Sequence, residues 1–473
     1  MKIEEVLNRM RGTDNKIYPY NPDDIVGVWQ SWYKGKSAFH TYMIYNGKNP
    51  VKMSRKSLNM AKRACEDWAN LLLNEKTEIT LSDALSNENL EEIFDNTGFW
   101  TKINGGLEKS FALGEGAIVA KVDVDVTDKG QNTKTGEIGI LFFNRTKIYP
   151  LTIENGRTVE CAFVQVDEEK VKVSIHQRGE NGTYEIINAV ASGKDMASLV
   201  LDEDSIYSFD TRSKDPLFMI LKPNIQNNID IDSPYGISIF ANAIDIMESI
   251  DLVFDSETNE YSLGRKRIFV STPTDTTVDP VNGKQEPVFD SNDVVYYVLP
   301  NNIDGKNLIQ DSTQPLRIEE HEKGIQANLN RFSAAVGFGN NRYKYDQGSV
   351  ATATQVISEN SDMFRNIQKH ETLLRDELIS FVKAIMRIAN EFTAYSFNEA
   401  SDIVVTFDDS IIEDKESRKA SDRLDVAQRI MSKEEYRAKW YGEDEETARA
   451  KIAEIDVMTI PDDMDESGDG QGV

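Results

Sequence analysis

Apolar residues recur every three or four positions along much of this 473-residue chain, which is the spacing of one face of an amphipathic helix. This pattern predicts helices at residues 3–11, 54–73, 87–94, 101–113, 236–264, 318–336, 349–391 and 415–455. The longest of these stretches, residues 349–391, contains no Gly or Pro and has Ser349 as a candidate N-cap.

The pattern changes to strands in three places. Between residues 116 and 190, β-branched or alternating runs are separated by turns that contain Gly and Asn, which predicts a mainly antiparallel sheet. Residues 402–407, DIVVTF, predict one further strand. Residues 265–318 hold five of the 13 prolines and the β runs RIFVST and VVYYVLP, so we expect a small strand-rich insertion there. The alternation of helical and strand-rich regions predicts an α+β fold.

The helix expected at residues 236–264 has one apolar face and one acidic face. The acidic face carries four carboxylates within about 120° of each other: Asp245, Glu248, Asp251 and Asp255. We interpret them as a surface that faces water or a channel. The alternatives are a solvated outer face or pairing with a neighbouring subunit.

Three cations, Arg265, Lys266 and Arg267, follow this helix directly. Positive charge at the C-terminal end of a helix offsets the helix dipole, which is our first interpretation of these residues. Two helices that flank an insertion naturally pair antiparallel. The resulting stalk would bury its sides against further copies of the chain around an axis.

Residues 337–348, GFGNNRYKYDQG, contain three glycines and two asparagines and therefore predict a loop. Within it, cations and aromatic residues alternate from Arg342 through Tyr343 and Lys344 to Tyr345. This mixture suits transient contact with phosphates or sugar edges of DNA. The alternative is a loop packed against the next subunit.

The overall charge changes the interpretation of any DNA contact. The chain has 53 Lys and Arg against 80 Asp and Glu, a net charge of −27, so it should not hold nucleic acid by neutralising phosphates. Seven of the acids lie in residues 452–473, and we expect the last dozen residues to be disordered. No apolar run is long enough to cross a membrane. The only cysteines, Cys65 and Cys161, are expected to be reduced and partly buried.

The sequence offers little catalytic chemistry. It has no GxSxG or HExxH pattern, and the Gly35-Lys36-Ser37 tripeptide has Gln30 where a phosphate-binding loop needs its first glycine. Asp123 and Asp125 alternate with valines and fit one solvated face of a strand. We therefore predict no catalytic residues, no metal and no cofactor; a metal-dependent hydrolase would have to be built on scattered carboxylates.

The passage RIEEHEKGIQANLNRFSAAVGFGNNRYKYDQGSVATATQVISENSDMFRNIQKHE (317–371) resembles portal proteins of long-tailed phages that infect Gram-positive bacteria. The likeness includes a helix, a glycine-bearing loop and a Thr-Ala-Thr-(Glu/Gln)-Val step, which residues 352–356 carry with Gln355 in place of a glutamate. AKRACEDWANLLLNEK (61–76), FALGEGAIVAKVD (111–123) and RKRIFVS (265–271) also match. The resemblance spans about residues 50–440.

This resemblance implies the portal fold, with the family's parts assigned by position. They are a wing at 1–235 and 349–410, stem helices at 236–264 and 319–336, a clip at 265–318, a tunnel loop at 337–348 and a crown with acidic tail at 411–473. The 349–410 part contains the long channel-side helix and a wing strand. Trp29, Trp32, Trp68 and Trp100 are expected in the core or at subunit interfaces.

The resemblance also implies a homo-oligomeric ring, usually of twelve subunits, at one capsid vertex of the virion, assembled in the host cytoplasm. Double-stranded DNA would pass through non-specifically, since a carboxylate-lined bore permits sliding. The other implied partners are the terminase large subunit, the head–tail adaptor, and the major capsid and scaffolding proteins. Arg265, Lys266 and Arg267 could then contact DNA or the connector. The competing hypothesis is a head or neck adaptor that conducts no DNA.

Overall fold

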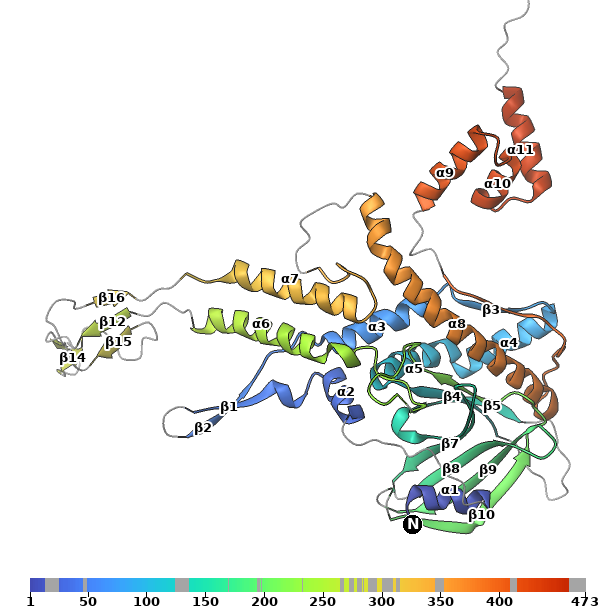
Figure 1. Ribbon diagram of the computed structural model, residues 1–473, viewed down its shortest axis with the longest axis horizontal. Coiled ribbons are helices and arrows are strands. Elements are labelled where there is room, and N and C mark those ends of the chain that lie inside the picture. The colour runs from blue at the N-terminus through green and yellow to red at the C-terminus, as the bar shows by residue number, and fades with distance from the viewer. Residues whose placement is uncertain are drawn as a thin grey trace, which may run out of the picture. The chain divides into compact units, whose positions relative to one another are not determined.

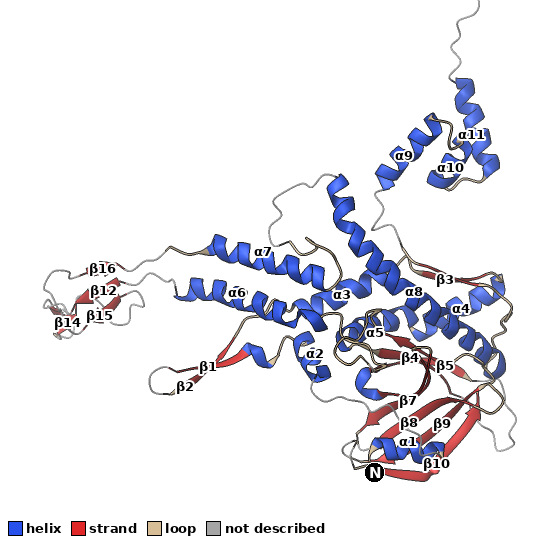
Figure 2. Ribbon diagram, viewed as in Figure 1, coloured by secondary structure: helices blue, strands red, loops and turns tan. Residues whose placement is uncertain are grey.

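The computed structural model describes most of the chain and shows an α+β protein (Figures 1 and 2). The described residues are 1–12, 25–45, 49–123, 136–168, 170–193, 196, 198–231, 233–263, 268–271, 276–278, 283, 285–287, 296–299, 309–311, 315–344, 353–408 and 415–458. The chain divides into two compact units, residues 1–350 with 359–407 and residues 351–358 with 408–473.

The first unit contains a five-stranded antiparallel sheet in the order β10-β9-β8-β7-β6. Its strands are β6 (Ile148–Glu154), β7 (Arg157–Asp167), β8 (Lys170–Arg178), β9 (Tyr184–Ser192) and β10 (Val200–Asp210). Helix α1 (Ile3–Arg11) covers one face of this sheet, where Val6 and Leu7 share a core with Val164 and Ile175. The predicted N-terminal helix is therefore confirmed with its bounds.

A separate three-stranded antiparallel sheet has the order β11-β4-β5. It consists of β4 (Gly116–Asp123), β5 (Glu137–Asn144) and β11 (Phe218–Leu221). The short 3-10 helix η2 (Arg145–Lys147) separates β5 from β6, so the chain leaves one sheet and enters the other. The strands predicted at 116–190 are confirmed, but they form two sheets because periodicity specifies strands and not their partners.

Helix α5 (Phe99–Leu113) packs closely on this smaller sheet. A side chain at Gly106 would place its Cβ only 2.8 Å from the Phe142 ring, so the close approach requires glycine. The other helices of this layer are α2 (Ile25–Tyr33), α3 (Met60–Leu72), α4 (Ala84–Thr97) and α8 (Ala353–Phe392). Trp29, Trp32 and Trp68 are buried here, which confirms their predicted place in the core, whereas Trp100 is half-buried. Strands β3 (Glu78–Leu81) and β17 (Ile403–Thr406) pair antiparallel, so the strand predicted at 402–407 is confirmed.

Two expected helix starts are wrong. The helix expected from residue 54 starts at Met60, because Ser54 belongs to β2 (Pro50–Ser54), which forms a hairpin with β1 (Thr41–Tyr45), and the backbone N–H groups of Lys56 and Leu58 donate to Asp255 and Asp251. The helix expected from residue 236 starts at Ile244 as α6 (Ile244–Leu263), after the 3-10 helix η3 (Ala241–Ala243). Gly236 is needed for close backbone packing instead, since a Cβ there would lie 2.2 Å from Gly114 O.

Helix α7 (Ile318–Ala335) follows the strand-rich insertion, as predicted. The insertion contains β12 (Ile268–Ser271), β13 (Thr276–Val278), β14 (Gln285–Pro287), β15 (Tyr296–Leu299) and β16 (Ile309–Asp311). Strand β12 pairs parallel with β15 and antiparallel with β16, and β13 pairs with β14. Both predicted β runs are thus strands.

The second unit holds three short helices where one charged helical region was expected. They are α9 (Lys415–Ala427), α10 (Lys433–Tyr441) and α11 (Glu445–Met458). A capping box of Ser432 and Glu435 starts α10, and Gly442 with φ +64° ends it. Trp440 Nε1 donates to Asp422 Oδ2 at 2.7 Å and joins α10 to α9. The tail beyond residue 458 and Ser349 lie outside the described residues.

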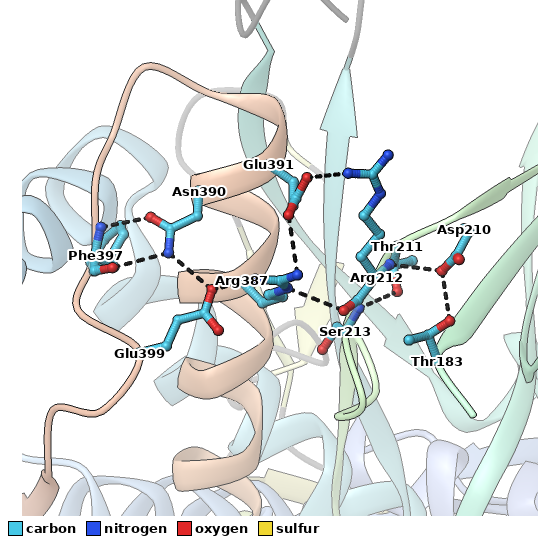
Figure 3. Close-up of polar contacts among 10 residues, drawn as sticks. All are labelled: Thr183, Asp210, Thr211, Arg212, Ser213, Arg387, Asn390, Glu391, Phe397 and Glu399. Carbon is cyan, nitrogen blue, oxygen red and sulfur yellow. Dashed lines mark hydrogen bonds and ion pairs between the residues drawn. The ribbon is translucent and has the colours of Figure 1, made fainter. Parts of the chain in front are cut away.

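A polar junction fixes the end of α8 to the five-stranded sheet (Figure 3). Arg387 on α8 donates to the carbonyl of Arg212 at 3.2 Å and to Glu399 Oε1 at 2.6 Å. The Arg212 guanidinium in turn donates to Glu391 at 2.7 Å. Asn390 bonds both backbone groups of Phe397, so the chain leaving α8 turns back along it.

Candidate functional site

Helices α6 and α7 pack along each other in the first unit (Figure 1). Met247 and Ile250 of α6 are buried, as are Ile325 and Leu329 of α7. A Cβ on Gly324 of α7 would be 3.4 Å from Val253 Cγ1, an ordinary van der Waals contact that shows how near the two helices approach. The predicted pairing of the two helices that flank the insertion is confirmed.

One end of this pair is held by an ion pair. Arg317, just before α7, donates to Glu260 of α6, with Arg317 Nε 2.9 Å from Glu260 Oε1. His321 Nε2 lies 3.6 Å from the same oxygen. The hydrogen bond from Arg317 lowers the pKa of Glu260 below its usual value. This carboxylate therefore stays ionised and links the two helices where the insertion begins.

Helix α6 is also hydrogen-bonded to the segment that precedes α3. Asp251 is only 2% exposed and accepts hydrogen bonds from Ser57 Oγ at 2.8 Å and from Leu58 N at 2.9 Å. His40 Nε2 lies 2.8 Å from the same carboxylate. Asp255 accepts from Lys56 N at 3.0 Å. These bonds also hold residues 56–58 outside α3.

The predicted acidic face is therefore wrong for two of its four members. Asp251 and Asp255 are buried inside the chain and satisfied by its own donors, so neither faces water. Helical spacing put them on one side with Asp245 and Glu248, but a segment about 200 residues earlier in the sequence covers that part of α6. Asp245 is exposed and Glu248 half-buried, so these two remain candidates for a water-facing surface.

Ser37, His40 and Asp251 are connected in the order of a nucleophilic triad. The Ser37 amide donates to His40 Nδ1 at 3.1 Å, which leaves the imidazole proton on Nε2 facing Asp251. Ser37 Oγ lies 3.0 Å from Nδ1. All three side chains are buried, at 6%, 5% and 2% exposure, so a substrate could not reach the serine. The arrangement is a structural clamp.

The loop after α7 is anchored at its start by aromatic packing. Phe338 stacks on Trp68 of α3 with ring centroids 4.6 Å apart. Trp68 Nε1 donates to Val336 O at 2.9 Å, and Asn366 of α8 donates to Gly337 O at 2.8 Å. Gly337 has φ +91°, a conformation that glycine adopts without strain. Residues 336–338 are therefore fixed between α3 and α8.

Further along this loop, the predicted DNA-contact residues differ in their surroundings. Arg342 and Lys344 are exposed, with the Arg342 guanidinium 5.6 Å from the centroid of the Phe338 ring. Tyr343 instead packs on Phe332 and Phe338 at centroid distances of 5.9 Å, and burial raises its pKa. The half-buried ring is held against these two aromatic side chains, and its predicted role in contacting DNA stays a prediction. Tyr345, and likewise Arg265, Lys266 and Arg267, lie outside the described residues.

The sequence interpretation missed His40, Ser57, Phe338 and Asn366. Each acts through a partner far along the chain, such as His40 with Asp251 or Asn366 with Gly337. Only the Gly-Phe-Gly sequence at 337–339 gave a local signal, since two glycines around one aromatic residue suggest a buried ring at a tight turn.

Metal and thiol chemistry find no support in the described part of the chain. No group of three or more His, Cys, Asp or Glu there could hold a metal ion. Cys65 and Cys161 are both free and buried, as predicted, and burial raises the pKa of each thiol. His176 and His370 are buried, and burial lowers the pKa of each to about 3, so both are neutral packing residues. None of the helices described is long and apolar enough for a membrane crossing.

Three features of the described geometry stand together. A helix pair flanks a strand-rich insertion, the loop after α7 is anchored by aromatic packing, and the cluster of Ser37, His40 and Asp251 is buried and structural. A family model described as phage portal protein, SPP1 Gp6-like, matches residues 26–461, and the chain belongs to this family. The family consists of structural, non-enzymatic proteins that form oligomeric rings associated with the capsid. No curated protein matched the chain.

Proposed function

We propose that this chain is the ring subunit through which double-stranded DNA enters and leaves the phage head. The observation that carries the proposal is the family match over residues 26–461, which includes α6, the insertion, α7 and the loop after it in one continuous match. Twelve copies would form the ring at one capsid vertex of the virion, after assembly in the host cytoplasm.

The family's parts are assigned to this chain as a proposal. The wing comprises residues 1–235 and 349–410, the stem is the α6–α7 pair, the clip is 265–318, and the crown is 411–473. The tunnel loop is 337–348. The clip would dock the terminase large subunit during packaging and the head–tail adaptor afterwards, and the wing would meet capsid and scaffolding proteins.

Electrostatics support weak contact with DNA rather than tight binding. DNA carries about one negative charge per 1.7 Å of axis, so a bore rich in cations would hold it and slow its movement. The chain carries a net charge of −27 and exposes Asp245 on α6. Against this acidic background, Arg342 and Lys344 are exposed cations on a loop whose base is fixed. Two cations on a loop with a fixed base suit brief contacts with the phosphates of moving DNA.

A packaging assay with Arg342→Ala and Lys344→Ala together tests this proposal. We expect the yield of DNA-filled heads to fall severalfold, since both side chains are exposed and their removal leaves the anchoring by Phe338 intact. Arg365→Ala is the matched control, because Arg365 is an exposed arginine of α8 whose ion pair in the described part of the chain is with exposed Asp362. An unchanged yield in the double variant would contradict the role of this loop.

The acidic surface has its own test. Asp245→Asn with Glu248→Gln should slow packaging if the two carboxylates keep the bore from adhering to DNA.

Electron microscopy of the purified protein tests the competing function. Rings without a central hole would favour a head or neck adaptor that conducts no DNA.

A further inference from the structure

The β1–β2 hairpin is a two-stranded sheet whose side chains are almost all exposed. The residues of β2 are all exposed, and only Tyr42 in β1 is half-buried. Several of the exposed side chains are large and apolar, including Tyr45 at 71% and Met43 at 58% exposure. An isolated two-stranded hairpin is marginally stable in water, and clustered exposed apolar side chains mark an interaction surface.

The hairpin lies within an unusual run of charge. Between Asp24 and Glu66 the sequence contains eight Lys or Arg and no Asp or Glu, in a chain with a net charge of −27. Lys34, Lys36, Lys52 and Lys56 are exposed, and none has an ion-pair partner among the residues that the structure describes. This surface is therefore basic and apolar on an otherwise acidic protein.

The base of the hairpin is fixed to α6. His40, directly before β1, contacts Asp251, and Lys56 N, shortly after β2, donates to Asp255. Arg55 packs its guanidinium 4.3 Å from the Tyr42 ring centroid and 4.4 Å from that of Phe39, which stiffens the base. In Figure 1 the hairpin extends from this base in the direction in which α6 runs.

We propose that the β1–β2 hairpin docks on the α7 side of a second copy of this chain. The inference rests on the ring of the proposed function. In a ring each subunit uses two different surfaces, one toward each neighbour. Since the hairpin is anchored beside α6, the neighbouring copy meets it with the opposite side of the helix pair, which is α7.

The start of α7 offers a matching surface. Glu319, Glu320 and Glu322 are exposed there, together with the apolar Leu316 at 40% exposure. The two exposed cations described at this end of α7 already contact carboxylates of the same chain: Lys323 lies 3.6 Å from Glu319, and Arg317 donates to Glu260. The distance along the helix pair also fits. The start of α7 lies beside Glu260, which is less than two helical turns beyond Asp255 on α6, where the base of the hairpin is fixed. A five-residue strand such as β1 spans about 17 Å, so the hairpin is long enough to reach the same level on a neighbouring copy.

DNA is the other polyanion that a basic hairpin could contact. The exposed Met43, Ile44 and Met53 argue for protein, because phosphate contacts are made by cations and polar groups and gain nothing from aliphatic side chains. A second copy satisfies both the charge and the apolar surface.

Cross-linking between two differently labelled copies tests the contact. Tyr45→Cys chains are mixed with Glu320→Cys chains, assembled, and treated with a short bis-maleimide. The native Cys65 and Cys161 are buried, so a covalent dimer must join introduced thiols, and each variant assembled alone shows whether two identical thiols can be linked. We expect a dimer in this mixture and none when Val200→Cys, on exposed β10, replaces Glu320→Cys. Rings of wild-type mass without a cross-link would overturn the inference.

A second test of the contact reverses the charges on the hairpin and then on α7. Lys52→Glu with Lys56→Glu should lower the ring yield at least tenfold, as measured by native mass spectrometry. Adding Glu319→Lys and Glu320→Lys should restore it. All four side chains are exposed, so the monomer's melting temperature should not change.

The outcomes separate this inference from the proposed function. If the wild type forms no ring under any condition, both are overturned. If rings form and package DNA but charge reversal leaves the yield unchanged, only the hairpin contact is wrong. If the reversed variant keeps full ring yield but loses DNA passage, the hairpin contacts DNA and the inference is overturned.

Discussion

Asp251 joins three parts of the chain at a single carboxylate. Its oxygens accept from Ser57 Oγ and Leu58 N and contact His40, so one side chain on α6 fixes both ends of the β1–β2 hairpin. Removing a buried acceptor leaves its donors without partners, which costs more than the bonds contributed.

Asp251→Ala should lower the free energy of unfolding by about 2–4 kcal/mol, because the buried His40 and the half-buried Ser57 and Leu58 lose their shared partner. Asp245→Ala is the matched control from the same helix. Asp245 is exposed, so its loss should cost less than about 0.5 kcal/mol. Urea denaturation of both variants measures the difference. Equal stabilities would show that the Asp251 clamp contributes nothing.

The burial of His176 makes the stability of the fold depend on pH. Its ring lies between Phe163 and Phe218 at centroid distances of 5.2 and 5.7 Å, and burial lowers its pKa from 6.5 to about 3. The folded chain therefore keeps this histidine neutral at pH values where the unfolded chain protonates it. The stabilisation is complete above pH 6.5 and is lost as the pH falls from 6.5 toward 3.

His176 should give a measurable slope in a plot of the free energy of unfolding against pH. At pH 5 the protonation of His176 in the unfolded chain should lower the free energy of unfolding by about 2 kcal/mol. His176→Leu should reduce the number of protons taken up on unfolding at pH 5 by about one. Phe163→Leu is the control, since it disturbs the same core without a titrating group and should keep the slope. A slope unchanged in His176→Leu would refute the assignment.

At the level of elements, the junction at the end of α8 shows how a long helix is fixed to a sheet. Arg387 contacts the Arg212 carbonyl, Glu391 and Glu399, and so connects α8 with two loops (Figure 3). A network of this kind contributes more than an isolated exposed ion pair.

Arg387→Ala should lower the free energy of unfolding by about 1–2 kcal/mol, because it removes three contacts of one guanidinium. Arg365→Ala removes a single exposed pair of the same helix, 3.7 Å from Asp362, and should have no measurable effect. Differential scanning calorimetry distinguishes the two. A loss no larger in Arg387→Ala than in Arg365→Ala would contradict the importance of the junction.

Helix and strand positions were largely predictable because their periods are local properties of the sequence. The N-terminal helix, α7, the long α8 and both β runs of the insertion follow their patterns. The expected starts at residues 54 and 236 were too early, because Pro50–Ser54 pairs with β1 and Gly236 packs against Gly114. Such long-range contacts leave no trace in local spacing.

The candidate site was less predictable for the same reason. Helical spacing grouped Asp245, Glu248, Asp251 and Asp255 correctly on α6 but could not reveal that His40 and residues 56–58 cover two of them. Alternation of cations and aromatics marked the loop after α7, yet Tyr343 packs inward because Phe338 and Phe332 provide a surface for its ring.

At the scale of the whole molecule, the charge distribution connects assembly with function. Net charge of −27 disfavours tight DNA binding and also makes copies of the chain repel each other. The acid-free residues 25–65 supply a local exception on each copy. A ring can therefore gain attraction between neighbours while its overall surface stays anionic.

A cryo-electron microscopy structure of the purified oligomer would show whether the chain forms a ring that DNA can pass through. We expect a closed ring with α6, α7 and the loop after α7 from every copy around an open centre wide enough for a DNA duplex. Particles without such an opening, or a ring with these elements on its outer rim, would contradict this expectation.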